Sequence, residues 1–131
     1  MRLAAQILQK IIGHPVSHFS GSGQKRALGR IAIKSLAKLF PLHGDLLDEP
    51  FLVTLCDISY ETVGLISPRA MMPHAGMILS IPLPGDEDKS IAIRCRVMRC
   101  TRGMGGRFSV AAQFIGLCDL KILLTRMKSL S

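Results

Sequence analysis

Two arginines four residues apart, Arg26 and Arg30, have the type and spacing that suit the binding of an anion. They lie in the stretch "GSGQKRALGR", after a segment rich in glycine and serine and directly before an apolar run. The guanidinium group is a planar fork of donors that matches phosphate and carboxylate oxygens and the edge of guanine. The chain has ten arginines in 131 residues. One such pair is expected by chance about once, so its meaning depends on the residues that follow.

A carboxylate and a hydroxyl, Asp57 and Ser59, form a second candidate pair in the predicted strand "FLVTLCDIS". Side chains alternate between the two faces of a strand, so we expect both to share one face while Ile58 points into the core. Together they can accept hydrogen bonds from a base edge and donate one to a phosphate oxygen. An ordinary solvated face or a turn at the strand end would contain the same residues.

The order of the two pairs resembles the PilZ domain, a family of bacterial receptors for cyclic diguanylate. The family's first motif is Arg-xxx-Arg, here "QKRALGRIAI", and its second is Asp/Asn-x-Ser-x-x-Gly, here "DISYET". Later segments, "MILSIPLPG", "IAIRCRVMRC" and "RFSVAAQFIGL", are similar to later strands of the family's barrel. The resemblance covers roughly residues 24–118.

The sequence departs from the family at the glycine of the second motif. Without a gap, Thr62 occupies that position, whereas a two-residue insertion would place Gly64 there. In the family this glycine permits a tight turn and close approach of the ligand, as a residue without Cβ allows. Thr62 would restrict the backbone and crowd a nucleotide, which affects ligand affinity more than the fold.

The resemblance implies a role for each motif residue. Arg26 and Arg30 would hold guanine and phosphate, and we expect their segment to order around the ligand. Asp57 would bind the Watson–Crick edge of guanine or brace an arginine. Ser59 would contact a phosphate or a base.

Two further cations are candidates by the same resemblance. In the family, the residue before the first arginine influences whether one ligand or a stacked pair binds, and the basic Lys25 favours the pair. Family members often have an arginine at the position of Arg99. Strand alternation puts Arg94 and Arg96 on one face and Arg99 on the other, unless a bulge or strand end intervenes. These arginines could also form a solvated face without a ligand.

Length and charge favour one domain with an anionic partner. A chain of 131 residues can bury a core of its own, and 48% of its residues are apolar. The formal net charge is +8, with a pI near 9.9. This positive charge indicates that a partner would be negatively charged, but it does not identify that partner.

The pattern along the chain predicts a mainly β fold. We expect a six-stranded antiparallel PilZ-type barrel with a short N-terminal helical extension and a C-terminal helix. Residues 1–12 read as an amphipathic helix, 13–29 as a mobile linker and 117–130 as the closing helix; either helix could be a lid, a docking surface or a dimer contact. Residues 41–50, 68–76 and 85–89 read as loops or turns, and 90–102 and 107–117 as a hairpin joined by "GMGG". The predicted division is 1–20 for the helix and linker and 21–131 for the barrel with its C-terminal helix.

Several functions are not expected. The four cysteines have no zinc-site spacing and read as reduced, apolar residues, while His14 and His18 are separated by a proline, so we expect no metal. No catalytic motif appears, so we expect no enzyme and no cofactor. Every apolar run is too short to span a membrane, and with no clear signal peptide the expected location is cytoplasmic.

Three functions remain for such a chain. The first is a single-domain receptor for cyclic diguanylate that relays binding to a protein partner as a monomer or weak dimer. The alternative is a PilZ-fold interaction module that does not bind the dinucleotide. A nucleic-acid binder is disfavoured, because aromatics that could stack on bases make up only 5% of the residues.

Overall fold

The structure, a computed structural model, describes residues 1–13 and 30–130, and these are mainly β-strands. Helix α1 covers Ala5–Ile12, helix α3 covers Leu120–Leu130, and the short 3-10 helix η2 covers Met104–Gly106. The strands are β1 (Ile31–His43), β2 (Leu46–Leu47), β3 (Phe51–Ile58), β4 (Thr62–Ser67), β5 (Gly76–Leu83), β6 (Asp86–Arg102) and β7 (Phe108–Cys118). The predicted boundary at residue 20 lies outside the described residues, and the division into 1–20 and 21–131 stays a prediction.

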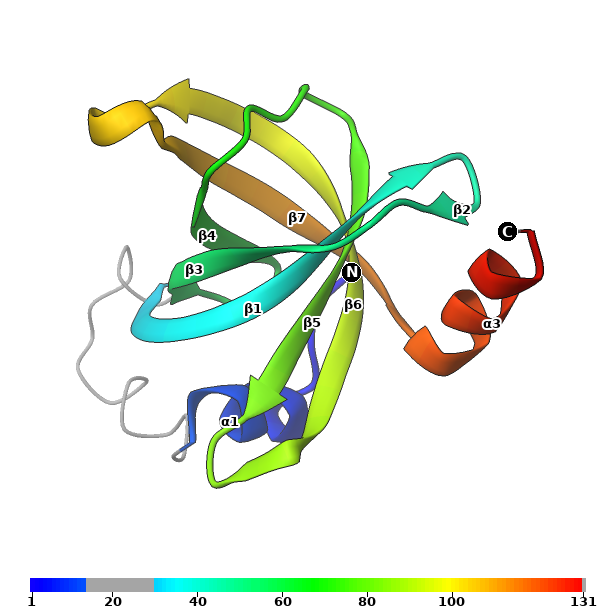
Figure 1. Cartoon of the computed structure of the whole chain (residues 1–131). Coiled ribbons are helices and arrows are strands. Elements are labelled where there is room, and N and C mark those ends of the chain that lie inside the picture. Colours follow the sequence, from blue (N-terminus) through cyan, green and yellow to red (C-terminus); the bar gives the residue numbers. More distant parts are fainter. Residues whose placement is uncertain (14–29, 131) are drawn as a thin grey trace.

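Six strands close into an antiparallel barrel in the order β1-β3-β4-β7-β6-β5 (Figure 1). The ring closes because β1, which is 13 residues long, pairs with β3 over residues 31–39 and with β5 over residues 38–41. Strands β6 and β7 form the predicted hairpin, and β2 pairs with the end of β1 outside the barrel. The predicted six-stranded barrel with a helix at each end of the chain is therefore confirmed.

The core lies inside the barrel and is filled by one side of each strand. Alternation puts Val53 and Leu55 of β3, and Val63 and Leu65 of β4, inside with almost no exposed surface. Phe114 of β7 is the largest of the fully buried side chains. The opposite side of the same strands faces outward, and the candidate site lies there.

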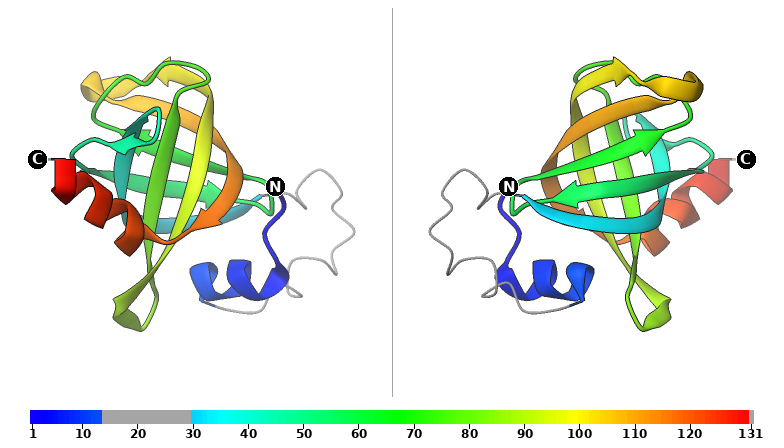
Figure 2. Two further views of the ribbon diagram at one scale, coloured as in Figure 1. Left: turned by 90° about the vertical axis from the view of Figure 1, so that its right-hand side faces the viewer. Right: turned by 90° about the vertical axis from the view of Figure 1, so that its left-hand side faces the viewer.

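Helix α1 covers one end of this core. Leu8 and Ile11 on the helix, and Leu3 in the extended segment before it, are buried in the same cluster as the barrel residues. The helix ends where Gly13 adopts a left-handed φ of 84° and donates its N–H to the carbonyl of Gln9. Figure 2 shows α1 at the end of the barrel away from the β6–β7 hairpin tip. The helix thus acts as a lid on apolar barrel surface.

A second, smaller apolar cluster lies where α3 packs against the barrel, and it corrects the predicted loop at 41–50. Its buried members are Phe40, Leu47, Ile78 and Ala92, and α3 adds Leu120, Leu123 and Leu124. Because Leu47 is buried here, the chain stays extended: β1 continues to His43, and Leu46–Leu47 pair with it as β2. The loop prediction is wrong for these residues.

The predicted turn at residues 85–89 is also shorter than expected. Leu83 pairs with Asp86, so the turn consists of Pro84 and Gly85, and Gly85 has a φ of 79°. Residues 86–89 already belong to β6. A proline–glycine turn of this kind needs only two residues to reverse the chain.

Candidate functional site

Asp57 faces outward because of an irregularity in β3. The pairing of β3 with β4 joins Leu55 to Leu65 and then Asp57 to Gly64, so the register shifts by one residue at Cys56. Strict alternation from Val53 and Leu55 would have directed Asp57 into the core. The shift puts Ile58 there instead, fully buried, and leaves the Asp57 side chain 30% exposed on the outer face.

Gly64 is the residue directly opposite Asp57, and its missing side chain makes room for the carboxylate. A Cβ at position 64 would lie 2.8 Å from Oδ1 and 3.0 Å from Oδ2 of Asp57. Distances this short are not seen for real Cβ atoms, so the carboxylate lies over Gly64 only because that residue is glycine. Of the two residues left open by the sequence, Gly64 and not Thr62 adjoins Asp57.

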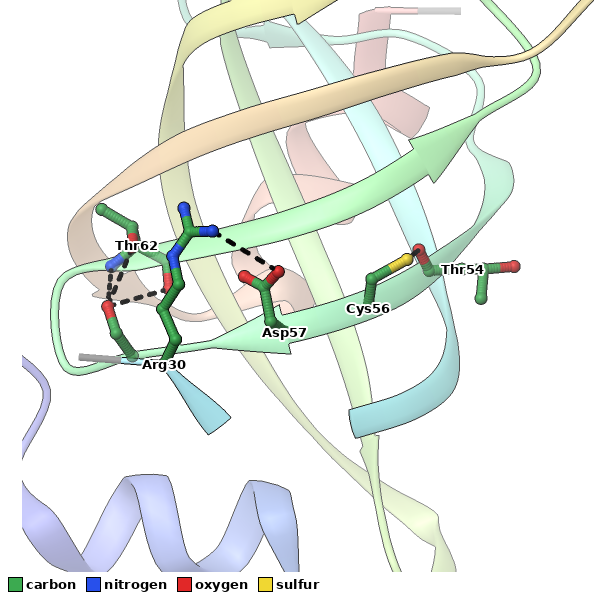
Figure 3. A network of polar contacts seen from close by, with 6 residues as sticks. Arg30, Thr54, Cys56, Asp57 and Thr62 are labelled. Carbon is green, nitrogen blue, oxygen red and sulfur yellow. Dashed lines mark hydrogen bonds and ion pairs between the residues drawn. The ribbon is translucent and has the colours of Figure 1, made fainter. Parts of the chain in front are cut away.

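Arg30 stands at the entry to β1 beside this carboxylate. The next residues, Ile31 and Ala32, pair with Ile58 and Asp57, which brings Arg30 close to the end of β3. One guanidinium nitrogen of Arg30 lies 3.9 Å from Oδ2 of Asp57 (Figure 3). The Arg30 side chain is 59% exposed, and an exposed ion pair at this distance adds little stability. The guanidinium can therefore turn its donors to a ligand at small cost.

Ser59 has a different environment from the predicted one. Strand β3 ends at Ile58, and the buried Ser59 hydroxyl accepts hydrogen bonds from the backbone N–H groups of Thr62 at 2.9 Å and Glu61 at 3.2 Å. It also lies 2.9 Å from the Thr62 hydroxyl. The hydroxyls of Ser59 and Thr62 thus contact each other within the β3–β4 turn, and the expected shared outer face of Asp57 and Ser59 does not form.

Replacement of Ser59 by alanine should therefore affect stability. We expect a loss of about 1–2 kcal/mol in the free energy of unfolding, because two turn N–H groups lose their acceptor. Urea denaturation measures this, with Ser109→Ala, an exposed serine on β7, as the control expected to change by less than about 0.5 kcal/mol. A Ser59→Ala protein as stable as the parent would contradict a structural role.

Arg99 reaches the same outer face as Asp57, through a second bulge. In the β6–β7 pairing Val97 opposes Ala112 and Arg99 opposes Ala111, so Met98 is the extra residue. Val97 is fully buried, while Met98 and Arg99 are exposed. The sequence left the face of Arg99 open to such a bulge. Ala111, which Arg99 opposes, was not singled out from the sequence.

Other candidate residues are placed as follows. Lys25 and Arg26 lie outside the described residues, so their roles stay predictions. Of the cysteines, Cys95 is buried, and burial raises its pKa; burial and, to a smaller extent, the charge of Asp57 raise the pKa of Cys56. Thiols whose pKa is raised are poor nucleophiles at neutral pH.

Two properties of the described ranges bear on other functions. In residues 1–13 and 30–130, no group of three or more His, Cys, Asp or Glu side chains is arranged to hold a metal ion. His14 and His18 lie outside these ranges. Within residues 1–13 and 30–130, no helix is long and apolar enough to cross a membrane.

The closed barrel, the end helices and the order of strands define a PilZ-type fold. A solved structure with this fold is that of the Bacillus subtilis inhibitor of motility MotI/DgrA, a PilZ-domain protein. The two align with a TM-score of 0.55 at 15% sequence identity, over 77% of this chain and 48% of that one, so this chain spans about half of its length. At this identity the similarity concerns the fold. No family model matches the sequence, and no curated protein matches it.

Proposed function

We propose that this chain is a non-catalytic receptor for cyclic diguanylate. The ligand binds on the outer barrel face at Arg30, Asp57 and Gly64. Arg26 and Lys25, which precede Arg30 in the chain, are proposed as further contacts on sequence grounds alone. A net charge of +8 favours the approach of a ligand with two phosphates.

The observation that carries this proposal is the Arg30–Asp57 pair above Gly64. The Arg30 side chain is 59% exposed, and its fork of donors suits a phosphate or O6 and N7 of guanine. The Asp57 carboxylate can accept from the Watson–Crick N–H groups of guanine or hold Arg30 in place. Gly64 lets the carboxylate lie close against the sheet, and we expect a flat base to lie above it.

Binding is relayed to a protein partner in the cytoplasm, with the receptor a monomer or weak dimer. The ligand can shift the segment that contains Arg26 and Arg30 only by the difference in its affinity for two positions of that segment. The fold is shared with an inhibitor of motility, which supports a regulatory role of this kind.

Calorimetric titration with cyclic diguanylate tests the proposal. We expect micromolar or tighter binding by the parent and a loss of about tenfold or more in Arg30→Ala, because a charge-assisted contact contributes about 1.5–3 kcal/mol. Arg107→Ala removes the same charge at the exposed hairpin tip and should bind like the parent. No heat from the parent, or equal affinity in Arg30→Ala, would refute this function.

A PilZ-fold interaction module without a dinucleotide ligand is the second candidate. One observation favours it: the hydroxyls of Ser59 and Thr62 contact each other in the turn, which leaves the second motif with one fewer group for a ligand. The absence of heat in the parent titration would select this candidate. A parallel titration with a single-stranded oligonucleotide tests nucleic-acid binding, the function that both candidates exclude. We expect no saturable signal in it.

A further inference from the structure

The outer face at Asp57 continues across four neighbouring strands in one row. Asp57 on β3 is paired with Gly64 on β4, Gly64 with Ala111 on β7, and Ala111 with Arg99 on β6. Residues directly opposite each other in antiparallel strands have side chains on the same face. The row therefore has a charged residue at each end and the two smallest side chains in the middle.

In the middle of the row, Gly64 and Ala111 form what we call the floor of the face, and Asp57 and Arg99 at its ends form the walls. Strands are spaced about 4.8 Å apart, so the backbones of Asp57 and Arg99 are separated by roughly 14 Å. Within that width the Asp57 carboxylate lies over Gly64, and on β7 the side chain of this row is only the Ala111 methyl group. The next row on one side is filled by Thr62, Gln113 and Arg96, where Arg96 donates to Oε1 of Gln113 at 3.5 Å.

The charges at the ends of the floor complement a nucleotide with two phosphates. The Arg30 guanidinium lies beside Asp57, and Arg99 lies at the far end of the row on β6. A guanidinium can bind a phosphate or stack on a base, while a flat base needs a surface free of side chains. Two bulges, at Cys56 and Met98, direct Asp57 and Arg99 to this face. If either bulge were absent, Asp57 or Arg99 would be missing from its end of the row.

We propose that Ala111 is a ligand-contact residue that forms the floor of the binding face, with Arg99 as its far wall. The ligand then lies across strands β3, β4, β7 and β6, with a purine base over Ala111, beside the Asp57 carboxylate that lies over Gly64. This inference rests on the proposed function. It adds one requirement to that function: the side chain of residue 111 must be small for the ligand to bind.

Ala111→Leu tests the floor, and Ser109→Leu is its matched control. Ser109 is exposed on the same face of β7, one row away, where it pairs with Ile66 and Thr101. In calorimetric titration with cyclic diguanylate, we expect Ala111→Leu to bind at least about tenfold more weakly, and Ser109→Leu to stay within about threefold of the parent. Equal thermal melting curves would show that both variants are folded.

Arg99→Ala keeps the proposal testable if Ala111→Leu fails to fold. It should weaken binding about tenfold, whereas Arg94→Ala, another exposed arginine of β6 outside the row, should not. Parent-like affinity in Ala111→Leu, or in Arg99→Ala where the leucine variant does not fold, would overturn this inference alone. No binding by the parent would overturn the proposed function and this inference with it.

Discussion

Gly64→Ala is expected to weaken the binding of cyclic diguanylate by about thirtyfold while the barrel stays folded. The new Cβ would lie 2.8 Å from Oδ1 of Asp57, so the carboxylate must rotate away from its position over the strand. Only the end of a short side chain has to move, which costs the fold little. The ligand, however, loses a charge-assisted partner held in place, and about 2 kcal/mol corresponds to this factor. Calorimetric titration and a thermal melt measure the two effects separately.

Gly116→Ala is the matched control for this substitution. Gly116 also lies in a strand, and a Cβ there would meet no atom within 4 Å. We expect its affinity to equal that of the parent. Parent-like affinity in Gly64→Ala would show that the carboxylate position does not matter for binding.

A double-mutant cycle shows how Gly64 acts. If alanine at 64 works by displacing the carboxylate, then Gly64→Ala should add little to the loss already caused by Asp57→Ala. Residues in direct contact show such non-additivity, whereas independent contributions add. Fully additive losses would mean that residue 64 meets the ligand directly and not through Asp57.

Much of the fold could be predicted from the sequence, because patterns within short segments determine where these strands, turns and helix ends form. Alternating apolar residues and the "GMGG" tip specify the β6–β7 hairpin, and Gly13 ends α1 by its left-handed backbone. The segment around Leu46–Leu47 could not be predicted as a strand. Its pairing with β1 accompanies burial of Leu47 near α3, a contact between segments about 75 residues apart.

The site was harder to predict because two bulges decide which side chains share a face. The inward residues of β3 are Val53, Leu55 and Ile58, with a spacing of two and then three. Spacing of this kind within a strand signals an extra residue, and it agrees with the expectation that Ile58 faces the core and Asp57 the outside. The burial of Ser59 in the turn after β3 could not be predicted from the strand pattern. In β6 the buried Val97 is followed by an exposed pair, Met98 and Arg99, and only the pairing reveals the bulge.

Phe114→Ala should cause the largest loss of stability of any substitution considered. Phe114 has no exposed surface and lies in the main core cluster, so its removal leaves a cavity that the barrel strands cannot close. Such substitutions cost about 3–5 kcal/mol, a large part of the roughly 5–15 kcal/mol that stabilises a domain of this size. Urea denaturation measures the loss. Phe108→Ala, the same deletion at a partly exposed position of β7, should cost less than half as much.

The same variant also separates the core from the ligand face. Phe114 points into the barrel, whereas its strand neighbours Gln113 and Ala111 face outward, so a folded Phe114→Ala protein should retain the site. At a ligand concentration of about 100 times Kd, binding stabilises the folded state by about 2.7 kcal/mol, whatever its starting stability. Cyclic diguanylate should therefore raise the urea midpoint of Phe114→Ala about as much as that of the parent, since both expose similar surface on unfolding. Arg30→Ala should show a smaller rise in the urea midpoint at the same ligand concentration. A rise in Arg30→Ala equal to that of the parent, or no rise in Phe114→Ala, would mean that the ligand binds at another site.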